Sequence, residues 1–127
     1  MKVKTSELQG AALDRAVAKC EGFCPFSDGI SWIIEDAGAY KKLPEYPTDW
    51  AHGGPILERE DISVAKVGRS LDDAMAPHPD CWCAHIDGVF AVYGPTPLVA
   101  AMRCYVASKL GAEVDVPDEL IQLGETV

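Results

Sequence analysis

The residues whose types and spacing best suit chemistry lie between positions 49 and 59. Asp49 precedes His52 by three residues, so one helical turn can place the carboxylate beside the imidazole and orient it. Two glycines follow, and glycine lets backbone N–H groups approach a ligand closely. The candidate ligand-binding set is Asp49, Trp50, His52, Gly53, Gly54 and Arg59. One hypothesis is therefore a small-ligand protein, either a hydrolase or a sequestering binder, that uses this Asp49–Arg59 cluster.

The same residues also suit a structural role, which we favour. Asp49 can cap a helix, Trp50 can anchor the segment in the core, and the glycines can form a turn. On this interpretation Trp50 is largely buried. The sequence has no phosphate-binding or dinucleotide-binding glycine fingerprint and no nucleophile elbow. It therefore indicates no catalytic residues and no cofactor, and a non-enzymatic protein is the expectation.

A second group with chemical potential consists of thiols and imidazoles. Cys81, Cys83 and His85 alternate on an expected strand and so share a face, and soft thiolates with imidazole suit zinc. The fold could also place Cys20, Cys24, His78 and Cys104 close to these three residues. Their spacing differs from that of zinc fingers, and buried cysteines commonly act as small apolar residues. We expect no metal site and no disulfide.

Length and charge limit the classes of partner. The 127 residues are typical of one domain, spanning 1–127, and the net charge is −9. Only 11 lysines and arginines are present and they are scattered, so direct nucleic-acid binding is not expected. Neither an apolar run of membrane-spanning length nor the apolar core of a signal peptide is found. The expected location is the cytoplasm.

The best-marked element is the helix expected from Pro97 to Leu110. Thr96 suits its N-cap, Pro97 its first turn and Gly111 the position after its end. The helix is apolar nearly all round, so every side must be covered. Large residues (Leu98, Met102, Tyr105 and Val106) are expected to face a sheet, and small ones (Ala100, Cys104, Ala107 and Gly111) form the opposite stripe. The first helix or a second copy of the chain could cover that stripe, so a homodimer through the Leu98–Leu110 helix is considered.

The remaining elements follow from periodicity and turn residues. A helix is expected over Ser6–Cys20, and residues 48–60 are expected to be helical but kinked or broken at the glycines. Strands are expected over 30–34 and 62–67, with a hairpin formed by 81–86 and 89–93. These elements predict an α+β fold, with a small, mainly antiparallel sheet of three to four strands covered by two to three helices.

Several of these blocks together resemble a known family. They are residues 48–60, residues 96–111 with the tail 116–120, and the N-terminal segments 1–8 and 13–18. The chain resembles the NinX-like group of small tailed-phage and prophage proteins, and its element order resembles phage α/β/α sandwich domains. The resemblance brings no assigned activity. It implies a phage or prophage accessory protein, which we expect to act by binding a host or phage component in the host cytoplasm.

Overall fold

The computed structural model describes residues 2–27, 32–66, 82–86 and 91–117. The helices are η1 (Thr5–Glu7, a 3-10 turn), α1 (Gly10–Cys20), α2 (Trp50–Arg59) and α3 (Pro97–Leu110). The strands are β1 (Lys2–Lys4), β2 (Phe26–Ser27), β3 (Trp32–Asp36), β4 (Ala39–Lys42), β5 (Ser63–Lys66), β6 (Trp82–His85), β7 (Val92–Gly94) and β8 (Glu113–Asp115). Within these residues, no helix has the length and hydropathy needed to cross a bilayer.

The strands form three small antiparallel sheets, which confirms the α+β class but divides the single sheet that the sequence predicted. β1 pairs with β8, β2–β3–β4 form one meander, and β5–β6–β7 form another. The expected hairpin is present, with Ala84 opposite Val92 and Cys83 opposite Tyr93. Its turn, the loop 69–80 and Cys81 lie outside the described residues.

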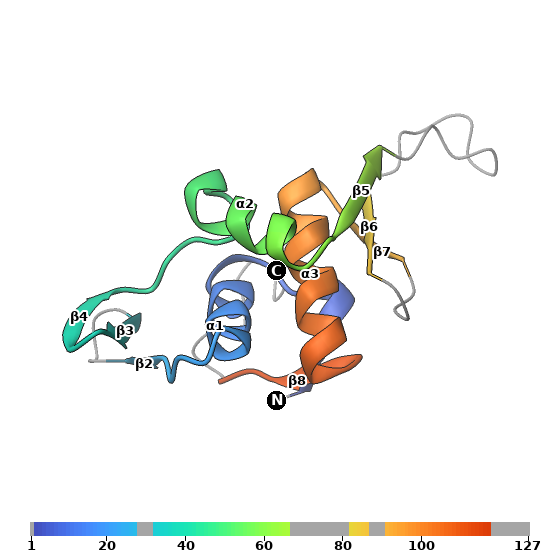
Figure 1. Cartoon of the computed structure of the whole chain (residues 1–127). Helices are drawn as coiled ribbons and strands as arrows, with labels where there is room; N and C mark the ends of the chain where they lie inside the picture. The colour runs from blue at the N-terminus through green and yellow to red at the C-terminus, as the bar shows by residue number, and fades with distance from the viewer. Residues whose placement is uncertain (1, 28–31, 67–81, 87–90, 118–127) are drawn as a thin grey trace.

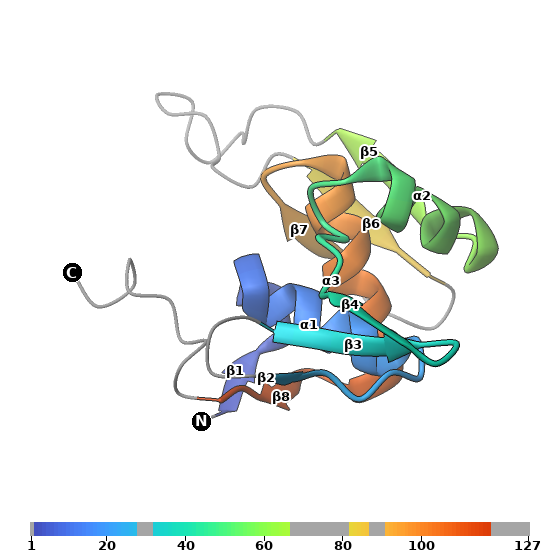
Figure 2. The same cartoon turned by 90° about the vertical axis from the view of Figure 1, so that its left-hand side faces the viewer.

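Helix α3 is the centre of the fold, where the sequence had predicted a sheet between helices. α1 lies beside it, α2 crosses near its N-terminal half, and the β5–β7 sheet packs on another side (Figures 1 and 2). Eight of its 14 residues are buried. An apolar helix without a polar face is stable in this position because neighbours from the same chain cover it.

Two residues of the small stripe, Ala100 and Cys104, lie against the β5–β7 sheet, where the sequence predicted the large residues. A Cβ atom added to Gly94 of β7 would lie 2.7 Å from the backbone nitrogen of Ala100. The larger Leu98 instead contacts Gly53 of α2. Short side chains allow the sheet backbone to come this close. Ala100 and Cys104 are fully buried by their own chain, so neither offers a surface to the second copy considered above.

The ends of α3 were predicted correctly because their signals are local. The Thr96 side-chain oxygen accepts a hydrogen bond from the backbone N–H of Val99 at 3.1 Å. Pro97 occupies the first turn, and Gly111 follows the last residue with a φ of +92°. A left-handed φ of this kind is costly for any residue with a Cβ atom.

Helix α1 begins at Gly10, four residues later than predicted. Gln9 takes the N-cap position, without a capping hydrogen bond from its side chain. The preceding turn is held by the far end of the chain: Thr5 Oγ1 donates to the carbonyl of Gly111 at 2.6 Å. Gly10 also has a left-handed φ of +59°, which residues inside an α-helix do not adopt, so the helix cannot extend back to Ser6.

Helix α2 runs without a break through Gly53, Gly54 and Pro55, so the predicted interruption is wrong. The reason is close packing at Gly53. A Cβ atom there would lie 2.3 Å from the carbonyl oxygen of Tyr46 and 2.8 Å from Leu98 Cδ1. Only glycine lets α2 approach both neighbours at this distance.

The two glycines should therefore respond oppositely to substitution. Gly53→Ala is expected to destabilise the protein by about 1–3 kcal/mol through overpacking. Gly54→Ala should stabilise it by about 0.5–1 kcal/mol, because alanine favours the helix and its Cβ would meet only Trp50 Cε3, at 3.6 Å. Urea unfolding of both variants measures the difference. If both substitutions stabilise, the packing assigned to Gly53 is wrong.

Candidate functional site

The N-terminal end of α2 contains the acid–imidazole pair that the sequence indicated. Asp49 Oδ1 accepts from the backbone N–H of Ala51 at 2.9 Å, and Oδ2 lies 3.0 Å from His52 Nδ1. A carboxylate only accepts, so Nδ1 is the protonated nitrogen of this pair. The Ala51 N–H first, and then His52, hold the pKa of Asp49 below its ordinary value. Both side chains are about half exposed, so the pair lies at the surface.

Trp50 lies in the first turn of α2 and is 55% exposed, which contradicts the predicted burial. The inward face of this helix consists of Gly53 and Ile56, its two buried residues. Trp50 is on the other side, with Gly54 one turn further along. The cap and close packing of neighbouring residues hold this segment in place, so the indole is not needed as an anchor.

Arg59 lies at the opposite end of the helix, about 14 Å along its axis from Trp50 at 1.5 Å per residue. Its guanidinium binds both oxygens of Glu21, at 3.1 and 2.5 Å, and Nε donates to Glu60 at 2.9 Å. A further bond of 3.2 Å reaches the hydroxyl of Tyr105. Hydrogen bonding to Arg59 is the largest effect on the Glu21 carboxyl and lowers its pKa. Arg59 thus fastens α2 to α1 and α3, and it does not join the Asp49–His52 pair.

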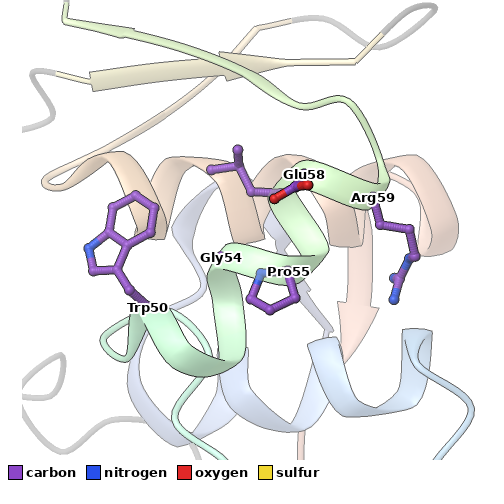
Figure 3. A pocket seen from close by; sticks show the side chains of 6 residues that line it. Trp50, Gly54, Pro55, Glu58 and Arg59 are labelled. Atoms are coloured by element: carbon purple, nitrogen blue, oxygen red, sulfur yellow. The ribbon is translucent and has the colours of Figure 1, made fainter.

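A shallow open groove follows the outer side of α2, with a volume of about 790 Å³. Its lining residues are Trp50, Gly54, Pro55, Leu57, Glu58 and Arg59. Figure 3 shows the indole of Trp50 at one end, the Arg59 side chain at the other and the Pro55 ring between them. Of the six residues predicted from the sequence, Trp50, Gly54 and Arg59 line this groove, and Asp49, His52 and Gly53 do not.

A known phage family matches most of the chain. The family model described as "Bacteriophage P22, NinX" matches residues 4–109. The chain belongs to the NinX family. This result confirms the resemblance inferred from residues 48–60 and 96–111, both of which fall almost entirely within the match. No curated protein matches the chain.

The thiols of this NinX family chain are not gathered into a metal site within the described residues. Cys20, Cys24, Cys83 and Cys104 are free, and no group of three or more potential ligands is found there. Burial raises the pKa of both Cys20 and Cys104 to about 11, so these thiols stay protonated near neutral pH. Protonated thiols are poor nucleophiles and poor metal ligands. His78 and Cys81, which were also considered as ligands, lie outside the described residues.

Asp14 is an unusual polar residue of this NinX family chain, and no sequence motif singled it out. It lies in α1 and is only 8% exposed. It lines a cavity of about 290 Å³ between α1, Trp32 of β3 and the connection from β4 to α2. Segments distant in sequence cause this burial, so no local pattern around position 14 could have indicated it.

Proposed function

We propose that this NinX family protein binds a protein of the phage or its host in the host cytoplasm, using the groove along α2. The observation that carries the proposal is the exposed indole of Trp50 at the end of that groove. Tryptophan is enriched among the residues that dominate binding energy in protein interfaces.

The helix that presents Trp50 is held at three places. Asp49 caps its start, Gly53 packs it against Tyr46 and Leu98, and Arg59 fastens its end to Glu21. A surface held in this way loses little conformational entropy when a partner binds. The geometry therefore suits recognition by a pre-formed surface.

Charge defines the kind of partner. The chain carries 20 acidic and 11 basic residues, and Glu58 lies in the groove itself. We therefore expect the partner to offer an apolar pocket for the indole, with basic residues around it. A nucleic acid does not fit this description of the partner, because its phosphates bind to clustered lysines and arginines, which this groove does not offer.

The alternative is a small-ligand site built on Asp49 and His52, whose side chains lie 3.0 Å apart. An oriented imidazole of this kind can act as a general base. However, Arg59 is engaged by Glu21 at the far end of the helix, so the pair lacks the cation that the sequence had assigned to it. Protein binding accounts for the exposed Trp50 and the groove along α2, which a site at Asp49 and His52 leaves unexplained.

Trp50→Ala should leave the free energy of unfolding within about 0.5 kcal/mol of the wild type, as is usual for exposed positions. The reason is that the indole is more than half exposed and lies away from the buried face of α2. Urea or thermal unfolding provides the measurement. A loss of several kcal/mol would show that Trp50 supports the fold and would remove it as a binding residue.

Binding itself is tested with a photo-crosslinking amino acid at position 50 in phage-infected cells. Position 40 is the matched control, because Tyr40 is also an exposed aromatic residue, at 69%. We expect one protein to be crosslinked from position 50 and not from position 40, and Glu58→Lys to weaken that product. Equal products from both positions, or none from position 50, would contradict the proposal.

A further inference from the structure

The cavity beside Asp14 shares no lining residue with the groove of α2. Its walls come from α1, β3, the end of β4 and the connection that follows. The lining residues are Gly10, Ala11, Asp14, Trp32, Lys42, Leu43, Glu45 and Thr48. With a volume of about 290 Å³, it is at the lower end of the range for small-molecule sites.

Asp14 lines this cavity and carries an unsatisfied acceptor. Its Oδ1 atom is buried and has no hydrogen-bond partner among the described residues. Buried polar atoms are almost always paired, because leaving one without a partner costs free energy. The missing partner of a carboxyl oxygen is a hydrogen-bond donor.

The charges around Asp14 favour a donor that is a cation. Glu45 lies on the cavity wall and adds a second negative charge, whereas Lys42 adds a positive one. The pKa of Asp14 is raised to about 7, first by burial and then by the negative charge of Glu45. The positive charge of Lys42 lowers this pKa, but by less than the other two effects raise it. Tyr46 is the further titratable group coupled to Asp14.

The other walls are apolar and suit a short hydrocarbon chain. Leu43 is buried, and Ala11 and Trp32 are partly buried. The indole of Trp32 is held in place by Arg15, whose guanidinium carbon lies 5.6 Å from the ring centre. From these observations, we infer that the cavity binds the primary ammonium group of a small alkylamine, with Asp14 as its acceptor.

Calorimetric titration tests the inference with named probes. The probes are 1,4-diaminobutane, a free amine, and Nα-acetyl-lysine methylamide, which represents a lysine side chain of a partner. The neutral 1,4-butanediol has a similar shape and no charge. We expect at least one amine to bind and the diol not to bind, because only a cation compensates the charge of Asp14. Tighter binding of 1,4-diaminobutane would identify a free amine as the ligand, and tighter binding of Nα-acetyl-lysine methylamide would identify a lysine side chain of a partner.

Two substitutions and a change of pH separate this site from general attraction to an acidic protein. Asp14→Asn keeps the shape and should weaken binding at least about tenfold. Glu35→Gln removes the same charge from an exposed position outside the cavity and should leave binding unchanged. With the Asp14 pKa near 7, affinity should be about tenfold higher at about pH 8 than at about pH 6.

Three results would overturn the inference: no heat from either amine at millimolar concentration, equal binding of the diol, or unchanged affinity in Asp14→Asn. Circular dichroism of each variant shows whether it is folded. Glu45→Gln, at an exposed position of the wall, gives a second measurement and should also reduce affinity. Trp50→Ala should have no effect, so the result is independent of the groove of α2.

Discussion

Replacing Arg103 by methionine is expected to destabilise the protein by about 3–5 kcal/mol. Arg103 lies in the middle of α3 and is only 5% exposed. Its Nε donates to the carbonyl of Leu8 at 2.7 Å, and Nη1 donates to the carbonyl of Tyr93 at 2.8 Å. One guanidinium thus joins the segment before α1, the strand β7 and the central helix.

The large cost follows from what the substitution leaves behind. Methionine can fill most of the volume, but it donates no hydrogen bond, so the two carbonyl oxygens lose the bonds from Arg103. Urea unfolding measures the change. Lys109→Met is the matched control on the same helix, because Lys109 is about half exposed and its ion-pair partner Glu60 is 3.7 Å away. If the two substitutions cost the same, the bonds of Arg103 contribute nothing measurable.

Arg103 also shows which parts of the fold could be predicted from the sequence. Helix α3 was predicted with both ends correct, because its cap and its terminal glycine act on residues within one turn. The role of Arg103 was missed, because it depends on carbonyls 95 and 10 residues away. Local chemistry was therefore predictable, and tertiary hydrogen bonding was not.

The candidate site likewise has one feature that the sequence predicted and two residues that it placed wrongly. The Asp49–His52 pair was predicted because three residues along a helix place the side chains side by side. Arg59 was assigned to the same cluster, but the bidentate contact with Glu21 joins positions 38 apart and places it elsewhere. Trp50 was expected inside because large aromatic residues usually pack, yet Gly53 gives α2 its close contact with the core.

The strands illustrate a different limit. Alternation predicted β5 and the hairpin of β6 and β7, since side chains of a strand point to opposite faces in turn. It did not reveal β1 and β8, which are three residues each and join the two ends of the described chain. Pairing between such short, distant segments has no periodic signature. The three-sheet arrangement therefore became visible only in three dimensions.

Asp14→Asn is expected to stabilise the unliganded protein, by about 2–4 kcal/mol above pH 7. Folding raises the pKa of Asp14 from 3.8 to about 7, so the folded state binds this proton more tightly than the unfolded state. The contribution of a raised pKa to stability is present at low pH and lost as the pH rises from about 4 to about 7. The difference between the two pKa values, at about 1.4 kcal/mol for each pH unit, sets the upper limit.

The pH profile distinguishes this cause from a general packing effect. Asparagine has nearly the same shape as aspartate but never ionises, so the advantage of Asp14→Asn should be small near pH 4 and constant above pH 7. Urea unfolding at several pH values gives the profile, and Glu35→Gln is the exposed control. A variant that is less stable at every pH would show that the carboxylate has a partner in the folded protein. If the stabilisation is found, the natural chain retains a costly buried acid, as is expected where a residue serves binding rather than stability.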